Sequence, residues 1–344
     1  MLSTLRDRPS GHLVMLETRT PYGVAVSAAG TIYVADGRWP RLAAFLPNGK
    51  LLWQRNVRGL GPGELMFPYR VVLDKAENVV VLDLGSKTLL WYAADGTFLR
   101  RGMLGLAFAT VSDIAILDGD RVVVSGISDD PRATGKSVHV FSRELAWQGS
   151  FIALPGGVPA DIQRLWGTGS LVRASWSSVL YAPKHAGGLT ELSSDGRVLR
   201  RIPVDDSDLT VPTDYFTITA RGTAGSHVRA ADSLITSGRP VLLARGGVLS
   251  VKIIGSRVRL TEHNGSGTPT AILDLGAADV MPIAFDSTTC TLTIRNRKSG
   301  ELGVAQLAVR LAHNARATTQ AHGASDETVH ADDGCTGARR GRSY

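Results

Sequence analysis

Short apolar runs separated by polar or glycine-containing turns make up most of the chain. The clearest example is the segment 21–53, PYGVAVSAAGTIYVADGRWPRLAAFLPNGKLLW, which aligns without a gap on the segment 68–100, PYRVVLDKAENVVVLDLGSKTLLWYAADGTFLR. Pro21 corresponds to Pro68, an offset of 47 residues (68 − 21) that is kept at every matched position. An internal repeat of this length indicates a repeat architecture.

Each repeat unit contains four apolar runs. In the second unit the runs are RVVL, NVVVLD, TLLWY and TFLRR, and turn-forming residues separate them. The runs are almost continuously apolar, which is typical of strands buried on both faces. Four such strands in an antiparallel sheet that packs between two neighbours favour a blade of a β-propeller.

Weaker copies of the same pattern continue at residues 112–151, 169–204, 239–263 and 281–311. We therefore predict an all-β fold, a single six-bladed β-propeller of four-stranded antiparallel blades over residues 10–312, with seven blades as the alternative. HLVML at 12–16 is a spare strand that would pair into the last blade and close the ring. Residues 1–9 would form an N-terminal extension. Residues 313–344 are poor in large aliphatic side chains, so we expect a disordered tail.

The stretch RGLGPGELMFPYRVVLD at residues 58–74 contains closely spaced glycines, as phosphate-binding loops do. A Walker loop needs Gly-Lys-Ser/Thr and a dinucleotide fingerprint opens a helix, whereas this stretch runs into a predicted strand. Pro62 also removes an amide that a phosphate would bind. We interpret the stretch as the turn between two blades.

The region has a fixed order of motifs: a Gly-Pro-Gly-Glu turn, a Phe and a Pro, two strands that end in Asp, and a closing Asp-Gly turn. They lie at Gly61, Pro62, Gly63, Glu64, Phe67, Pro68, Asp74, Asp83, Asp95 and Gly96. In this order they resemble the six-bladed β-propeller proteins related to NHL repeats, although the family pattern is Phe-x-x-Pro and here the Phe directly precedes the Pro. The resemblance is specific over residues 20–101. It implies a fold more than an activity, because the relatives include lactonase-like enzymes, amidating lyases and binding scaffolds.

Composition and charge exclude only a few classes of protein and of binding site. The 344 residues are 43% apolar and 20% charged, as in ordinary soluble proteins. The formal charge of +7 favours acidic partners, but Lys and Arg are scattered, so we expect no specific nucleic-acid binding. Cys290 and Cys335 are too few for a disulfide framework or a cysteine-based zinc site.

Targeting signals are not evident in the sequence as presented. No apolar stretch is long enough to span a bilayer, and the start MLSTLRDRPSG lacks the apolar core of a secretory signal. The compartment stays open. It is cytoplasmic as presented, and periplasmic or secreted if a leader precedes this start.

The connectivity of a four-stranded meander separates two faces of the ring. The first and third turns of each blade open on one face and are short. The second turn and the link between blades open on the other face, with longer loops at 36–41, 126–136 and 177–188. Binding residues usually lie on loops held by a rigid scaffold, so we place the site on this long-loop face. Its candidate residues are Arg38, Trp39, Tyr69, Arg70, Lys87, Arg132, Lys136, Trp176, Lys184 and His185.

This mixture of cations and aromatic rings is typical of a site for an anionic or sugar-like ligand, or for a peptide or protein segment. For each single residue the alternative interpretation is a solvated loop charge or a ring that packs the core. We expect a monomer without a cofactor.

Catalytic chemistry has weaker support. Asp36 and Asp83 end equivalent strands and could reach a calcium or zinc ion in the central channel, where propeller lactonases hold their metal. Capping of a turn amide in each blade explains the same repetition, and we favour it. The acidic stretch VDDSDLT at 204–210 lacks the glycine and terminal glutamate of an EF-hand loop. We therefore favour a non-catalytic binding scaffold over a metal-dependent lactonase, hydrolase or lyase.

Overall fold

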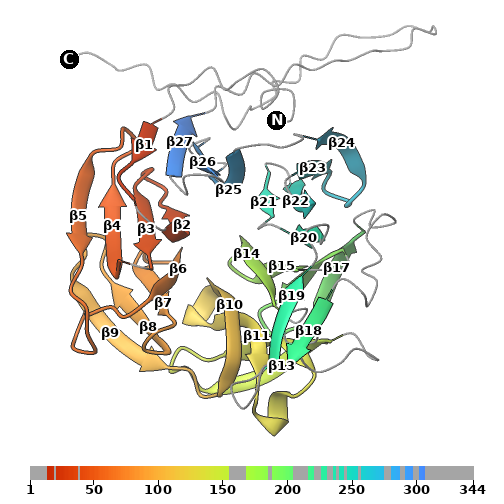
Figure 1. The fold of residues 1–344 in the computed structure, drawn as a ribbon, viewed down its shortest axis with the longest axis horizontal. Helices are drawn as coiled ribbons and strands as arrows, with labels where there is room; N and C mark the ends of the chain where they lie inside the picture. The colour runs from red at the N-terminus through yellow and green to blue at the C-terminus, as the bar shows by residue number, and fades with distance from the viewer. Residues whose placement is uncertain are drawn as a thin grey trace, which may run out of the picture.

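Antiparallel β-strands make up nearly all the regular structure of the computed structural model (Figure 1). The described residues are 14–18, 21–37, 39–154, 168–184, 188–203, 216–220, 226–230, 235–237, 240–243, 246–254, 257–274, 280–286, 291–296 and 302–306. Several predictions lie outside them, namely those for the N-terminal extension, the C-terminal tail, the acidic stretch at 204–210, Arg38, His185, Cys290 and Cys335.

The two aligned repeat units form two equivalent four-stranded sheets. The first contains β2 (Pro21–Val26), β3 (Ile32–Asp36), β4 (Arg41–Phe45) and β5 (Leu51–Arg55). The second contains β6 (Pro68–Leu73), β7 (Val79–Asp83), β8 (Thr88–Tyr92) and β9 (Phe98–Met103). Corresponding strands begin 47 residues apart (68 − 21, 79 − 32, 88 − 41 and 98 − 51), so the repeat read from the sequence is a repeat of blades.

The next two sheets follow the same strand order. The third contains β10 (Phe108–Ile116), β11 (Val122–Ser128), β12 (Lys136–Phe141) and β13 (Trp147–Ala153). The fourth contains β14 (Gly169–Ser175), β15 (Ser178–Pro183), β16 (Leu189–Ser193) and β17 (Val198–Ile202). The prediction that residues 177–188 form one long loop is wrong, because β15 lies within them. The apolar run SVLYAP is a strand, and Ser177 belongs to the turn that precedes it.

A hairpin of β18 (Phe216–Ala220) and β19 (Ser226–Ala230) follows the fourth sheet and pairs with no other described strand. The next sheet contains β20 (Ile235–Ser237), β21 (Val241–Leu242), β22 (Val248–Ile254), β23 (Arg257–His263) and β24 (Pro269–Asp274). β20 pairs with the second half of β22 and β21 with its first half, so together they act as one interrupted inner strand.

The last sheet is completed by the beginning of the chain. It contains β25 (Val280–Asp286), β26 (Thr291–Asn296), β27 (Leu302–Gln306) and β1 (Val14–Leu16) in adjacent positions. β1 pairs antiparallel with β27, in the register Val14 to Val304. The predicted closing strand is therefore confirmed. Leu16 also packs with Val24 and Ile32 of the first blade, which joins the two ends of the fold.

The sheets stand around a common centre with their first strands innermost (Figure 1). β2 contacts β6, β6 contacts β10, and β10 contacts β14; β14 contacts β21, β21 contacts β25, and β25 contacts β2. Four-stranded antiparallel sheets arranged in this way are the blades of an all-β propeller.

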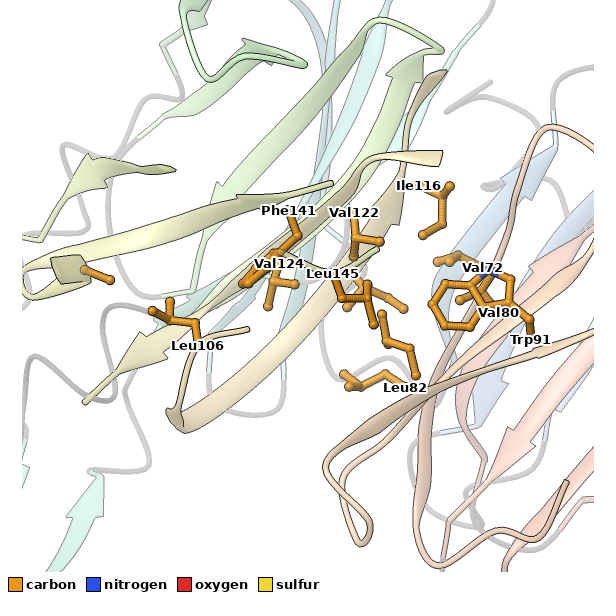
Figure 2. Close-up of a cluster of buried hydrophobic side chains, with 13 residues drawn as sticks. Val72, Val80, Leu82, Trp91, Leu106, Ile116, Val122, Val124, Phe141 and Leu145 are labelled. Atoms are coloured by element: carbon orange, nitrogen blue, oxygen red, sulfur yellow. The ribbon is translucent and has the colours of Figure 1, made fainter. Parts of the chain in front are cut away.

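The hydrophobic core lies between neighbouring blades. Every residue of β3, β4, β7 and β8 is buried, as the nearly continuous apolar runs predicted. Figure 2 shows the cluster between the second and third blades, where Leu82 and Trp91 meet Val124 and Leu145. Full burial of such a side chain is worth about 1.5–3 kcal/mol, so the contacts between blades hold the ring together.

The third turn of the second blade packs against the outer strand of the first blade. Trp53 of β5 donates from Nε1 to the carbonyl of Ala94 at 2.8 Å, and its ring lies over Gly96. Gly96 has a φ of +84°, and a Cβ there would lie 2.8 Å from the indole, so both backbone and space require glycine.

The Gly-Pro-Gly-Glu stretch is a link between blades, as its sequence indicated. Glu64 accepts a 2.7 Å hydrogen bond from the amide of Gly61, and its own amide donates to the Gly61 carbonyl. Leu65 is fully buried, and the chain then enters β6.

Candidate functional site

The strand order assigns each loop to one face of the ring. The first strand of a blade begins, and the second ends, on the long-loop face, as the pairing of Pro68 with Asp83 shows. Seven of the predicted residues lie at these positions. Six belong to the first three blades, namely Trp39, Tyr69, Arg70, Lys87, Arg132 and Lys136, and the seventh, Lys184, directly follows β15. We call the opposite side the short-turn face.

Two β-bulges shape the inner edge of the long-loop face. The pairing register shifts between Pro21 and Gly23 in β2, and between Pro68 and Arg70 in β6. The bulged residues are therefore Tyr22 and Tyr69, at equivalent positions of the two repeats. Bulges re-aim side chains and are frequent beside functional sites.

The bulged tyrosines meet in an aromatic cluster. The ring centroids of Tyr22 and Tyr69 are 5.5 Å apart, and Phe67 lies 5.2 Å from Tyr22 and 6.3 Å from Tyr69. All three rings are partly exposed. A bare backbone at Gly23 lets the blades approach, because a Cβ there would lie 2.7 Å from the amide nitrogen of Val71.

Arg70 joins three blades at this cluster. Its Nη1 donates to the Tyr22 carbonyl at 2.7 Å, and its Nε lies 3.4 Å from Asp113 Oδ1 of β10. The guanidinium carbon sits 4.1 Å from the centre of the Tyr69 ring, and Nη2 donates to the Tyr69 hydroxyl at 3.3 Å. Asp113 in turn accepts from the amide of Leu171 in β14 at 3.0 Å.

The other predicted residues of this face differ in their exposure and in whether an acidic side chain neutralises their charge. Arg132 pairs with Asp130 at 2.6 Å, and the hydrogen bond from this arginine lowers the pKa of Asp130 to about 2. Lys87 is exposed and Lys136 is half-buried. Trp39 is 52% exposed. Lys184 is exposed as a residue, yet burial of its ammonium group lowers its pKa, and the charge of Arg70 lowers it further.

Trp176 was placed on the wrong face by the sequence reading. It lies in the turn between β14 and β15, which is the first turn of its blade, and its carbonyl accepts from the amide of Asp118 in the equivalent turn of the third blade. Its ring lies 3.7 Å from the guanidinium of Arg173, which donates to the carbonyl of Leu73 at 2.6 Å. The error follows from missing β15, because one unrecognised strand reverses the face of the preceding turn.

The carboxylates considered as metal ligands have structural partners or are buried at strand ends. Asp83 is fully buried and accepts hydrogen bonds from the amides of Met66, Phe67 and Ser86 at 2.6, 3.0 and 2.9 Å. The capping role that we favoured for Asp83 is thus present. Asp36 is buried at the end of β3. Within the described ranges no group of three His, Cys, Asp or Glu side chains could hold a metal ion.

His139 is a buried histidine of the third blade. Its Nε2 lies 3.1 Å from the Gly126 carbonyl, which can only accept, so Nε2 carries the proton and Nδ1 accepts from Ser150 Oγ at 2.7 Å. Ser150 accepts in turn from Trp147 Nε1 at 3.0 Å. Burial lowers the pKa of His139 to about 4, so the ring is neutral near pH 7.

Phe67 and Asp113 belong to the site but were not predicted as such. Phe67 was noted only for its displacement in the family motif. Asp113 stands before an apolar run in SDIAIL, and one acidic residue in that position carries no signal of its contacts in the sequence. Among the described residues no helix is long and apolar enough to cross a membrane.

Comparison with known proteins supports the fold and no more. No family model and no curated protein matches the chain. Among solved structures, virginiamycin B lyase from Staphylococcus aureus superposes with a TM-score of 0.54 at 9% identity, over 87% of this chain and 100% of the lyase. A DUF4221 family member from Bacteroides vulgatus gives a TM-score of 0.53 at 8% identity, over 87% and 97%. A protein of unknown function from Bacteroides thetaiotaomicron gives 0.56 at 11%, over 87% and 73%.

The chain is a β-propeller. At identities this low, the similarity extends to the architecture of the blades, and the activity in the name of the lyase belongs to that protein.

Proposed function

We propose that this propeller is a non-catalytic binding protein, related to the NHL-repeat propellers, that captures an anionic partner on its long-loop face. One observation carries the proposal. The two bulged tyrosines, Arg70 and most of the predicted loop cations lie on that one face. Two of the described side chains that could serve hydrolytic chemistry have structural partners: Asp83 accepts from three amides, and His139 is held between Gly126 and Ser150.

We infer that the ring has six blades. The cycle of contacts from β2 through β6, β10, β14, β21 and β25 back to β2 supports this number. β14 contacts β21 directly, so the β18–β19 hairpin, which lies between them in sequence, is taken as an insertion and not as a seventh blade.

The proposal is tested with immobilised acidic polysaccharide. Polygalacturonate is compared with neutral dextran as a partner for the full chain, assayed by biolayer interferometry. We expect binding to the acidic polymer that weakens as salt rises, because exposed charges are screened. The double variant K87E/K136E should bind roughly tenfold more weakly, a loss of about 1.4 kcal/mol.

Lys50 provides the control. It is exposed and lies in the third turn of the first blade, on the short-turn face. K50E should bind almost as well as the wild type. Equal losses in K50E and K87E/K136E would show that net charge, and not the long-loop face, governs binding. A wild type that ignores the acidic polymer would contradict the proposed partner class.

A metal-dependent lactonase, hydrolase or lyase is the alternative function. It is tested by thermal unfolding of the full chain in EDTA, with calcium or zinc then restored. A ligand that binds only the native state raises the melting temperature, so a resident metal would give a loss that one ion reverses. The binding proposal expects no such loss.

A further inference from the structure

Two cations of the long-loop face are joined by a short path of contacts. Arg70 pairs with Asp113, and Asp113 accepts from the amide of Leu171 near the start of β14. The carbonyl of Thr168, just before β14, accepts from the amide of Lys184 at 2.9 Å. The backbone of Lys184 is thus tied to the start of β14, the side chain of Arg70 is tied to β14 through Asp113, and the charge of Arg70 acts on the Lys184 ammonium.

The charges of this group do not balance. Asp113 is 1% exposed as a side chain and offsets the charge of Arg70. Lys184 has no acidic neighbour of this kind among the described residues, and the groups that act on its ammonium are protein burial and the positive Arg70, both of which lower its pKa. One positive charge is left over, so a singly charged anion would neutralise the group.

The Tyr69 hydroxyl is oriented as a donor. Arg70 Nη2 can only donate, so the Tyr69 oxygen accepts that bond and keeps its own hydrogen free to donate to another acceptor. A hydrogen bond received from a cation also polarises the O–H group and strengthens the bond that it donates. The Tyr69 hydroxyl and the Lys184 ammonium are both groups that can donate to an anionic oxygen.

The aromatic cluster adds an apolar surface next to these donors. Tyr22 and Tyr69 are partly exposed, and Phe67 supports both rings. Ligand sites commonly combine aromatic surface with a few fixed polar groups, the rings contacting the carbon skeleton and the polar groups setting orientation.

We propose that Lys184, the Tyr69 hydroxyl and the Tyr22 ring form a site for a carboxylate carried on a sugar ring, that is, for one uronate unit. This inference rests on the proposed function, since it names the ligand class that the long-loop face recognises. Lys184 contacts the carboxylate directly, whereas Arg70 is a positioning residue that fixes the Tyr69 hydroxyl.

A ligand series separates the parts of the site. Isothermal titration calorimetry of the full chain uses sodium glucuronate, glucose, sodium acetate and inorganic phosphate. Glucuronate should bind at least tenfold more tightly than glucose, which lacks the charge, and more tightly than acetate, which lacks the ring. Tighter binding of phosphate would overturn the singly charged ligand, and equal binding of acetate and glucuronate would overturn the sugar ring.

Three variants test the residues. K184M should weaken glucuronate binding at least tenfold, and Y69F, which keeps the ring and removes the hydroxyl, should weaken it several-fold. K50M on the short-turn face is the matched control and should bind as the wild type does. Melting temperatures of all variants establish that they are folded. Unchanged binding by folded K184M would overturn the site.

Failure of this inference can be told from failure of the proposed function. If the wild type binds polygalacturonate through the long-loop face but no glucuronate, the uronate site is wrong and the binding face stands. If it binds neither, both fail.

Discussion

At the scale of single residues, buried polar groups of this protein act mainly as structural ties between strands. Arg70 spans the first three blades through the Tyr22 carbonyl and Asp113, and Arg173 links the fourth blade to the Leu73 carbonyl of the second. Such a group is costly to remove, because its partners then lose a hydrogen bond or an ion pair in a largely buried setting.

His139 should make stability depend on pH. Its pKa of about 4 in the folded state lies below the usual 6.5, so the unfolded state binds more protons between these values. The contribution of neutral His139 to the free energy of unfolding is therefore fully present above pH 6.5 and is lost as the pH falls toward 4. From pH 7 to pH 5 the loss due to His139 is about 2 kcal/mol.

The measurement is urea unfolding of wild type and H139Q at pH 7 and pH 5. The variant should be less stable at pH 7 but should lose much less on acidification. A remainder is expected from His263, whose pKa burial also lowers. An equal pH dependence in the two proteins would contradict the assignment.

At the scale of elements, each blade depends on the turn that leads into it. Asp83 ends β7, and its carboxylate holds the amides of Met66 and Phe67 just before β6, as well as that of Ser86. The same strand end therefore fixes both the second turn of the blade and the place where Phe67 joins the aromatic cluster. Aspartate is suited to this because a carboxylate only accepts and has several lone pairs.

Replacing Asp83 should show this capping role. D83A leaves three amides without their acceptor and should cost about 2–4 kcal/mol, whereas D83N keeps one acceptor oxygen and should cost less. Urea unfolding at pH 7 measures both. A D83A protein as stable as the wild type would contradict the role, and a D83N protein that loses an EDTA response seen in the wild type would point to metal binding.

At the scale of the whole molecule, closure of the ring is the property on which the fold depends. β1 pairs with β27, and Leu16 packs with the first blade, so a three-residue strand connects the two ends of the propeller. Without β1 the last sheet would present an unpaired edge, and unpaired edges promote association.

Deletion of residues 1–18 should therefore destabilise and associate the protein. Loss of the pairing and of Leu16 should cost about 3 kcal/mol or more, which corresponds to a fall in Tm of roughly 5–10 °C. Thermal unfolding and light scattering after size exclusion measure the two effects. Deletion of residues 1–9 keeps β1 and is the control. A monomeric, equally stable 1–18 deletion would show that the ring does not need this strand.

The sequence predicted the blades where its repeat is regular and failed where one strand was misread. The 47-residue offset, the turns and the apolar runs place β2 to β9, and the spare strand before them is β1. Reading residues 177–188 as a loop put Trp176 on the long-loop face, although it lies in a first turn. An error of one strand matters this much because antiparallel strands alternate in direction.

Local sequence determined the strands, the turns and the closing of the ring, because hydrophobic periodicity and turn chemistry act between neighbours along the chain. Only the tertiary structure decided which side chains meet. Tyr22 and Tyr69 are 47 residues apart in sequence (69 − 22), and Asp113, which pairs with Arg70, lies in a third blade. Their proximity arises from bulges and from the packing of inner strands around one centre, and no pattern within a single blade records it.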